Sequence, residues 1–209
     1  HALDMVRKQG LPLTNRVIRE SHQVLLAGAR GQNKTPGEYR KVPVFVGKPV
    51  PPPSHYVPDL IRDLEKFINE DSTCEPLIRV GLAHVQFETI HPFLDGNGRI
   101  GRLLITFFLM MMGDMRQPNL YLSLFFKNNR EEYYARLSAV RTAGDWEGWL
   151  DYFLHGVAET ANQVVATSQA ISSLFKVDQE KIATLKRAGI TAGEAHERLQ
   201  KVAISNAIN

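Results

Sequence analysis

Two apolar helical stretches joined by a polar segment constrain the fold more than any other feature of this sequence. Residues 75–90 and 97–112 place aliphatic and aromatic side chains on most of their helical surface, which is typical of helices buried in a core. Pro92 ends the first stretch, because a proline disfavours helical angles in the residue before it. The joining segment, residues 91–102, reads HPFLDGNGRIGR. We therefore expect two buried helices that meet at a polar loop.

The rest of the chain favours one mainly helical domain. Its 209 residues are 44% hydrophobic, which is enough for one sizeable core. Residues 28–53 are rich in glycine, proline and basic residues, and their β-prone run at 42–46 predicts a small hairpin within a loop. The fold is therefore predicted to be all-α with this one hairpin. Further helices are expected over residues 13–27 (capped by Thr14 or Asn15), 57–70, 129–140 (capped by Asn128 or Asn129), 146–173 (capped by Asp145) and 178–188.

Charge and cysteine content exclude several classes of protein. The net charge of +3 predicts neither a nucleic-acid binder nor a membrane-surface protein. The single cysteine, Cys74, allows no internal disulfide and favours a cytoplasmic setting. The longest apolar run, about residues 100–112, is shorter than the roughly 20 residues of a membrane span. There is no signal-peptide pattern at the N-terminus, and we expect the sequence to be trimmed at both ends.

The glycines and arginines of the polar segment form a pattern suited to binding an anion. Gly96 and Gly98 flank an asparagine, and glycine accepts left-handed backbone angles and a closely approaching ligand. The turn leads into a helix whose free N–H groups and positive dipole end attract negative charge. Arg99 and Arg102 project from one face of that helix. Two guanidinium groups at this position suit a phosphate chain better than a single carboxylate.

The remaining polar residues of the segment point to chemistry on that phosphate chain. Asp95 fits an anion site if a cation such as Mg²⁺ binds together with the phosphates. His91 is placed to take a proton from a hydroxyl group that attacks phosphorus. Phe93 is expected to turn inward and fix the loop to the core. The residues alone therefore predict nucleotide-dependent phosphoryl or nucleotidyl transfer.

The segment resembles the signature of the Fic (Fic/Doc) family, His-x-Phe-x-Asp/Glu-Gly-Asn-Gly-Arg-x-x-Arg, at every defined position. Residues 12–31, 35–40 and 51–69 resemble the first helix, the flap entrance and the segment before the core of these proteins. The resemblance covers roughly residues 10–155. It implies a helical Fic core over residues 1–155, with a β-hairpin flap at about 36–50 and the motif loop at 91–102. Residues 156–209 would be a helical extension that includes the start of a truncated winged-helix segment.

The resemblance also implies transfer of AMP from ATP to a Ser, Thr or Tyr hydroxyl of a target protein, with release of pyrophosphate. His91 would be the general base and Asp95 would hold Mg²⁺ on the phosphates. The residues expected to bind the nucleotide are Phe93, Gly96, Asn97, Gly98, Arg99 and Arg102, the two arginines on the β and γ phosphates. Doc-type kinases tend to carry a lysine at the position of Gly98, so the glycine favours AMP transfer.

Partners and regulation follow from the same resemblance. The target would dock by strand addition on the flap near residues 37–47. Many Fic proteins carry an inhibitory Ser/Thr-x-x-x-Glu-Gly/Asn motif whose glutamate pairs with the second arginine, and this sequence lacks it. If that helix precedes residue 1, Arg102 is expected to be unrestrained here. The protein is expected in the cytoplasm of a bacterium, without a membrane partner.

Several alternatives remain open at this point. The same site can hydrolyse AMP from a modified protein or transfer another nucleotide or phosphate-linked group. His84, Glu88 and His91 share a helix face and form an alternative set of metal ligands. The basic residues Arg30, Lys34, Arg40, Lys41 and Lys48 are interpreted as a solvated loop, with a role near the triphosphate or an acidic target as the alternative. A nucleic-acid-binding regulator would need residues 183–200 as the start of a winged helix. The oligomeric state is open, a homodimer included.

Overall fold

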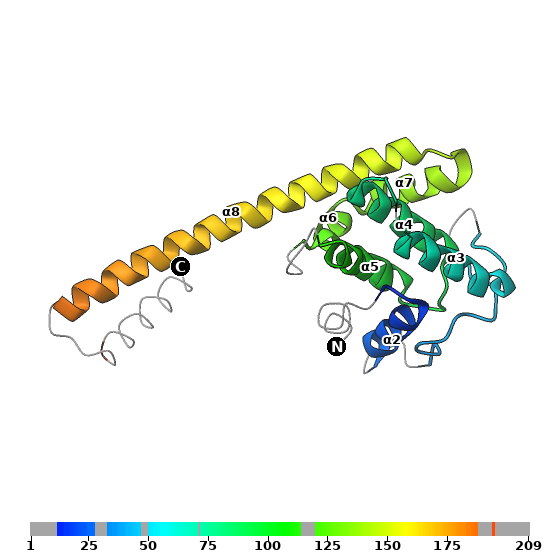
Figure 1. The fold of residues 1–209 in the computed structure, drawn as a ribbon, viewed down its shortest axis with the longest axis horizontal. Coiled ribbons are helices and arrows are strands. Elements are labelled where there is room, and N and C mark those ends of the chain that lie inside the picture. The colour runs from blue at the N-terminus through cyan, green and yellow to red at the C-terminus, as the bar shows by residue number, and fades with distance from the viewer. Residues whose placement is uncertain are drawn as a thin grey trace. The chain divides into compact units, whose positions relative to one another are not determined.

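The computed structural model describes residues 12–27, 33–46, 50–70, 72–113 and 120–187, together with Glu194. Within these residues it contains seven α-helices, one short 3-10 helix and no strand (Figure 1). The all-α prediction is therefore confirmed for the described part of the chain. The elements are α2 (Asn15–Leu26), η1 (Ser54–Tyr56), α3 (Val57–Asn69), α4 (Pro76–Ile90), α5 (Asn97–Met111), α6 (Leu122–Asn128), α7 (Arg130–Ala143) and α8 (Trp146–Arg187).

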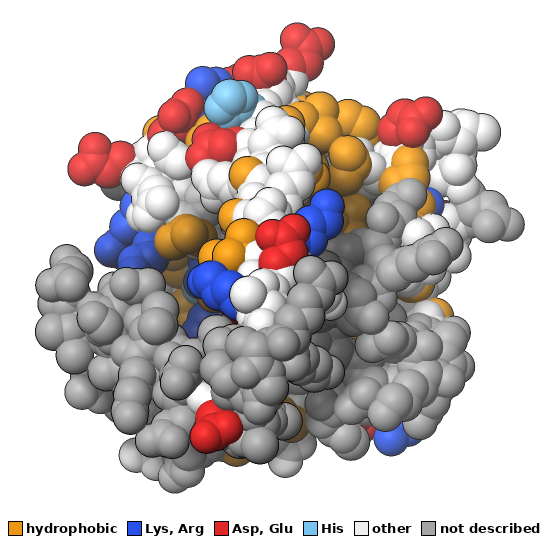
Figure 2. Space-filling view, turned by 90° about the vertical axis from the view of Figure 1, so that its left-hand side faces the viewer, with side chains coloured by type: hydrophobic (Ala, Val, Ile, Leu, Met, Phe, Trp, Pro, Cys, Tyr) orange, Lys and Arg blue, Asp and Glu red, His pale blue; other side chains and the backbone are white. Residues whose placement is uncertain are grey.

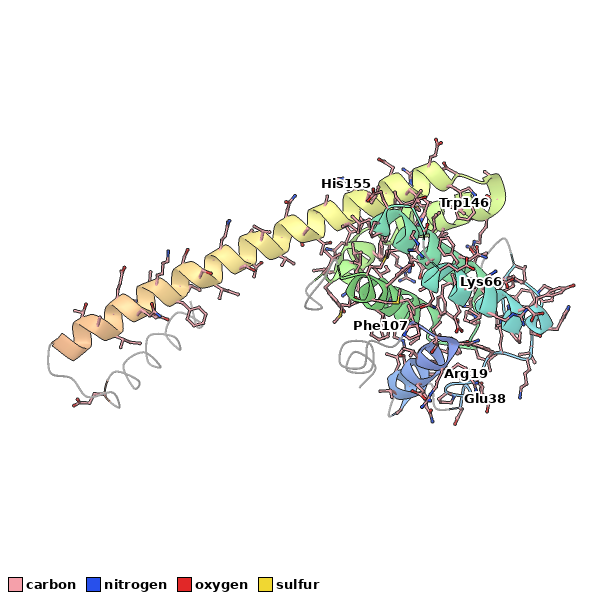
Figure 3. The ribbon with its side chains drawn as sticks, in the orientation of Figure 1. Arg19, Glu38, Lys66, Phe107, Trp146 and His155 are labelled. Atoms are coloured by element: carbon pink, nitrogen blue, oxygen red, sulfur yellow. The ribbon has the colours of Figure 1, made fainter. Side chains whose placement is uncertain are left out.

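The two apolar stretches form the central helices α4 and α5, which pack against each other. Helix α4 also contacts α3 and α7, while α2 contacts α5 and α3, so both central helices are covered (Figure 1). The core is rich in aromatic side chains: Phe87, Phe107, Trp149 and Phe153 are fully buried, and Figure 3 shows Phe107 among the packed helices. The central pair therefore provides a rigid base for the loop that joins its two members.

Most helix ends follow the sequence signals. Thr14 Oγ1 accepts a hydrogen bond from Val17 N at 3.4 Å, and Asp145 Oδ1 accepts one from Gly148 N at 3.0 Å, as expected of N-cap residues. Asn129 stands at the N-cap position of α7, but its side chain donates backwards to Phe125 O and closes α6 instead. Helix α6 is not predicted by the sequence pattern, because its seven residues are too few to show a helical period.

The segment predicted to form the flap has no strand within its described residues, 36–46 and 50. It consists of turns, bends and irregular backbone, with Val42 and Phe45 53% and 81% exposed. Residues 47–49 lie outside the described part of the chain. The β-hairpin therefore stays a prediction.

The chain divides into two units, residues 1–161 and 162–209. The expected boundary at 155/156 falls inside α8, and this helix continues through residues 173–178, where the sequence predicts a break. No glycine or proline interrupts that stretch, so nothing ends the helix there. In the second unit, α8 exposes Val165, Ile171, Leu174, Phe175 and Val177.

Surface charge bears on the nucleic-acid partner considered above, and helix length bears on a membrane partner. Figure 2 shows acidic, basic and hydrophobic side chains interspersed on the described part of one face. Residues 188–193 and 195–200 of the predicted winged-helix approach lie outside the described residues. Among the helices searched, none is both long and apolar enough to cross a bilayer.

Candidate active site

His91 follows α4 directly and adopts a left-handed backbone conformation, with φ 50° and ψ 62°. Its N–H donates to Phe87 O at 3.0 Å and closes the last turn of the helix. A positive φ is unfavourable in a residue other than glycine, so neighbouring contacts must hold it. The chain therefore turns sharply at the residue expected to act as the base.

Arg40 provides those contacts. Its Nε donates to His91 O at 2.8 Å, and its Nη2 donates to Ile90 O at 3.3 Å and to Pro52 O. Its backbone N–H donates to Pro92 O at 2.8 Å. Arg40 is 2% exposed, so its interpretation as part of a solvated basic loop is wrong. It connects the start of the predicted flap to the end of α4.

The loop itself is closed by Asn97, which is 2% exposed. Asn97 Oδ1 accepts from Phe93 N, and Nδ2 donates to Phe93 O, both at 2.8 Å. The ring of Phe93 is fully buried, as expected of a residue that fixes the loop to the core. Both side chains are thus occupied in shaping the loop, and a contact of Asn97 with an anion would use its backbone N–H.

His22 of α2 holds the outer side of the loop. Gly37 N–H donates to His22 Nδ1 at 2.8 Å, so this nitrogen carries no proton and Nε2–H donates to Asp95 O at 2.9 Å. The imidazole also stacks on Phe93, with ring centroids 3.7 Å apart. Burial lowers the pKa of His22, so the ring is neutral at neutral pH. One side chain therefore joins α2, the flap entrance and the motif loop.

The motif loop leads into the N-terminal end of α5 through Gly96. Gly96 has φ 80°, and its carbonyl accepts from Arg99 N and Ile100 N at 3.1 and 3.0 Å. Asp95 Oδ1 accepts from Gly96 N at 2.6 Å and lies 3.7 Å from Arg99 Nη2. The side chains of Asp95 and Arg99 are 50% and 42% exposed. A positive helix end and a partly exposed ion pair of a guanidinium and a carboxylate thus lie next to one another.

Gly98 differs from the expectation that both glycines are left-handed. Of the two, only Gly96 has a positive φ, whereas Gly98 lies in the first turn of α5. A Cβ atom on Gly98 would lie 3.1 Å from Arg102 Nη1. The absence of a side chain therefore lets the Arg102 guanidinium fold back along the first turn of its own helix.

The pKa of His91 is lowered to about 4, mainly by burial and to a smaller extent by the charges of Arg40 and Arg141, while a backbone hydrogen bond with Glu88 opposes the decrease. The imidazole is consequently neutral at neutral pH. A neutral imidazole can accept a proton, as a general base must.

The alternative metal site on α4 is not formed. His84 Nδ1 lies 2.9 Å from Gly101 O, and it must donate because a carbonyl oxygen can only accept. The other ring nitrogen, Nε2, therefore accepts from the Tyr133 hydroxyl at 2.9 Å. Burial also lowers the pKa of His84 to about 4. In the residues that the structure describes, no three His, Cys, Asp or Glu side chains converge on a common metal position. His84 is therefore a structural residue between α4, α5 and α7.

Residues 12–109, which include the loop and both central helices, match the model of the Fic/DOC family. The chain belongs to the Fic/DOC family. Protein adenylyltransferase fic-1 of Caenorhabditis elegans is 30% identical over 168 residues, which cover 79% of this chain and 31% of that protein. A probable protein adenylyltransferase of Aquifex aeolicus is 38% identical over 110 residues, 52% of this chain and 31% of that protein.

The fold agrees with solved Fic structures. The crystal structure of a Fic family protein from Desulfovibrio desulfuricans G20 superimposes with a TM-score of 0.70 at 25% identity, covering 95% of this chain and 60% of that chain. The chain spans about a third of the length of the curated Fic relatives it matches.

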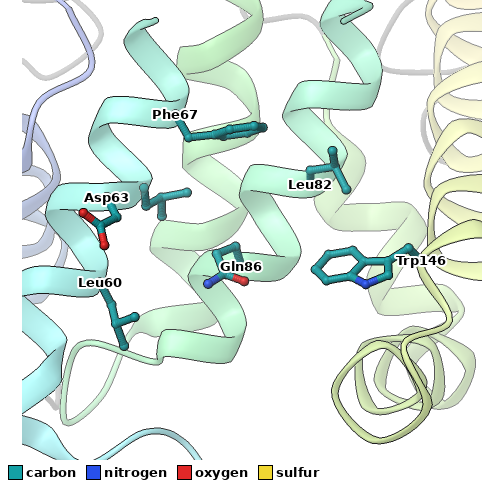
Figure 4. Close-up of a pocket in the computed structure, with 7 residues that line it drawn as sticks. Leu60, Asp63, Phe67, Leu82, Gln86 and Trp146 are labelled. Atoms are coloured by element: carbon teal, nitrogen blue, oxygen red, sulfur yellow. The ribbon is translucent and has the colours of Figure 1, made fainter.

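A pocket of this Fic domain lies between α3, α4 and the start of α8 (Figure 4). It is mainly apolar and carries no arginine or lysine. Its lining includes Leu60, Asp63, Phe67, Leu82, Gln86 and Trp146, and none of the motif residues. This composition does not suit a triphosphate, so the pocket is separate from the candidate site.

Sequence reasoning missed the roles of Arg40 and His22 in the Fic site. Arg40 binds backbone carbonyls, which leave no trace in a residue pattern. His22 had a usable signal, because it shares a helix face with Ile18 and Leu26, and all three are fully buried. On the same side of the domain, Arg19 Nε donates to Gly37 O at 2.7 Å, and Figure 3 shows Arg19 next to Glu38.

Proposed function

We propose that this Fic domain transfers AMP from ATP to a Ser, Thr or Tyr hydroxyl of a target protein and releases pyrophosphate. The observation that carries the proposal is a neutral His91 at the start of a loop that ends on the positive end of α5. The names of the relatives, protein adenylyltransferases from Caenorhabditis elegans and Aquifex aeolicus, support it.

In the proposed reaction, the target hydroxyl oxygen attacks the α-phosphorus of ATP. His91 takes the hydroxyl proton as the new P–O bond forms. The bond from the α-phosphorus to the oxygen that bridges to the β-phosphate breaks, and pyrophosphate leaves with the electron pair. Arg40 would contribute indirectly, because it fixes the backbone of His91 in its turned conformation.

The phosphates would bind at the start of α5. The N–H groups of Asn97 and Gly98, the first two residues of the helix, precede the first hydrogen bonds to Gly96 O, and they would bind phosphate oxygens. Arg99 and Arg102 would compensate the charge of the β and γ phosphates. Asn97 and Phe93 would keep the loop in the shape that presents these groups.

The donor set at Asp95 fits Mg²⁺. Asp95 offers an accessible carboxylate beside the proposed phosphate site, and Mg²⁺ is often held by one carboxylate, phosphate oxygens and water. When bound, Mg²⁺ would neutralise phosphate charge and orient the phosphate chain. Asp95 Oδ1 also accepts from Gly96 N, which fixes the direction of the carboxylate.

The target segment would dock on residues 36–50, folded as a β-hairpin flap, by adding a strand. Support comes from the exposed Val42 and Phe45, which lie two and five residues after the anchored Arg40. A cytoplasmic location and a bacterial source also stay predictions.

The experiment is a label-transfer assay with this chain, Mg²⁺, a cell lysate and ATP labelled at the α or the γ phosphate. We expect protein labelled from the α position, and a loss on the order of 10²–10⁴-fold in His91→Ala. His155→Ala, an exposed histidine of α8, is the matched control and should keep full transfer. Label from the γ position alone would indicate a kinase. Release of AMP from pre-labelled protein without new transfer would indicate the hydrolytic alternative.

A further inference from the structure

The Glu88 carboxyl group is a buried acid that the proposed reaction leaves without a role. Its Oε1 atom is inaccessible to solvent and has no hydrogen-bond partner among the described residues. The other such side-chain atom in the described part of the chain, Arg79 Nε, belongs to a guanidinium whose Nη2 already binds the carbonyls of Phe67, Ile68 and Glu70. A buried acceptor without a partner is uncommon and requires an explanation.

Two glycines of α5 make room for this carboxyl group. A Cβ atom on Gly101 would overlap Glu88 Oε1 and lie 3.1 Å from Glu88 Cδ. A Cβ atom on Gly98 would lie 3.9 Å from Glu88 Oε1 and 3.1 Å from Arg102 Nη1. The Glu88 carboxyl and the Arg102 guanidinium therefore border the same small space at the first turn of α5.

The titratable groups around Glu88 come from three helices. Arg102 of α5 faces it, as do Arg141 and Tyr133 of α7, and His84 lies one turn earlier on α4 in its neutral form. Burial raises the pKa of Glu88 to about 7, although Arg102 and Arg141 lower it. The guanidinium groups thus compensate the ionised carboxylate only in part, and the Arg102 guanidinium is also a proposed phosphate ligand.

We propose that Glu88 is a positioning residue for Arg102, whose guanidinium it holds beside Gly98, where the terminal phosphates of the nucleotide would bind. This inference rests on the proposed function, because it assumes a triphosphate at the start of α5. Glu88 does not touch the nucleotide and acts only through Arg102.

The test compares binding of ATP with Mg²⁺ and of AMP by calorimetry in wild type, Glu88→Gln, Arg102→Ala and the double variant. We expect Glu88→Gln to weaken ATP binding about tenfold, or about 1.4 kcal/mol, and to leave AMP binding unchanged. In the Arg102→Ala background the same change should have no further effect. Glu131→Gln, an exposed glutamate on α7, is the matched control and should bind both nucleotides as wild type does.

A purely structural role gives a different result. It would weaken ATP and AMP alike, and the loss would persist in the Arg102→Ala background. Either outcome overturns the proposal, as does ATP binding by Glu88→Gln that is as tight as in wild type or tighter.

A second variant perturbs the pair from the helix α5 side. Gly101→Ala should displace the carboxyl and reproduce the ATP-selective loss, because the new methyl group takes the space of Glu88 Oε1. Combined with Glu88→Ala, it should add nothing further. Independent, additive losses in the combined variant contradict the proposed role of Glu88 in positioning Arg102.

A ligand-free measurement separates this inference from the proposed function. The ¹³C signal of the Glu88 carboxyl, assigned by its absence in Glu88→Gln, is titrated in wild type and Arg102→Ala. Loss of the guanidinium should raise the pKa of Glu88, and an unchanged pKa overturns the inference whatever the nucleotide data show. Wild type that binds ATP without transferring AMP contradicts the proposed function while the binding cycle still decides on Glu88. If wild type does not bind ATP, the titration of the Glu88 carboxyl alone tests the inference.

Discussion

The protonation state of His91 is the single-residue property with the most direct consequence for activity. Its pKa lies near 4 in the folded protein because the imidazole is partly buried, against 6.5 for an ordinary histidine. The base is therefore already deprotonated in mildly acidic solution. Arg40 contributes twice, through its charge and through the hydrogen bond that fixes the backbone of His91.

We expect kcat/KM for AMP transfer by Glu88→Gln to remain level as the pH falls from about 8 to about 5.5, because His91 binds no proton in that range and the side chain at position 88 no longer titrates. The measurement is a pH–rate profile with a peptide or protein acceptor, together with an NMR titration of the His91 ring. A decline centred near an ordinary histidine pKa, matched by the ring titration, would contradict this prediction.

Glu88 should make the stability of the folded protein depend on pH. Its pKa is raised from 4.5 to about 7, so the folded state binds more protons than the unfolded state between these values, and stability decreases as the pH rises through them. We expect Glu88→Gln to increase the free energy of unfolding at about pH 8, with a smaller increase at about pH 5. Urea unfolding at both pH values measures this, with Glu131→Gln as the control. An increase that is equal at both values would mean that the charge is not responsible.

Residues whose function depends on backbone partners mark the limit of sequence prediction at this scale. The motif residues were predictable because their types and spacing carry the chemistry. The buried Arg40 and the unpaired oxygen of Glu88 were not, since carbonyl positions and glycine contacts appear only in the folded chain.

At the scale of elements, the junction of α4 and α5 depends on one asparagine. Asn97→Ala removes both hydrogen bonds to the Phe93 backbone and leaves buried polar groups unpaired. We expect a loss of about 1–3 kcal/mol in stability, together with a loss of ATP binding, because the start of α5 is released.

Asn69 is a matched control for this prediction. Its side chain binds the backbone of Leu13 in the same two-sided manner, with Leu13 N donating to Oδ1 and Nδ2 donating to Leu13 O, both at 3.1 Å. Asn69→Ala should lower the melting temperature without changing ATP affinity. Equal effects of both variants on ATP binding would show that the loop has no special dependence on Asn97.

Element prediction succeeded where strong local signals exist. Pro92 and the apolar period placed α4 and α5 within one residue of their observed bounds. It failed for α6, whose residues are held by packing of Phe125 and Phe126 against the core, and for the expected break in α8, where no glycine or proline interrupts the helix.

At the scale of the whole molecule, all residues of the candidate site belong to the first unit, residues 1–161. We expect a fragment of residues 1–161 to keep the ATP affinity of the full chain, within about twofold, because no site residue is removed. Calorimetry with ATP and circular dichroism check binding and folding. A folded fragment that no longer binds ATP would show that residues 162–209 contribute to the site.

The hydrogen bonds of Arg40 to the end of α4 have a consequence for target binding. The same residue begins the exposed stretch at 42–46, so its backbone leads outward while its guanidinium holds the turn that carries His91. A displacement of that outer stretch would therefore move the backbone of His91 through this hydrogen bond. If the target protein binds there, a single displacement would change both the binding of the target and the position of the His91 base.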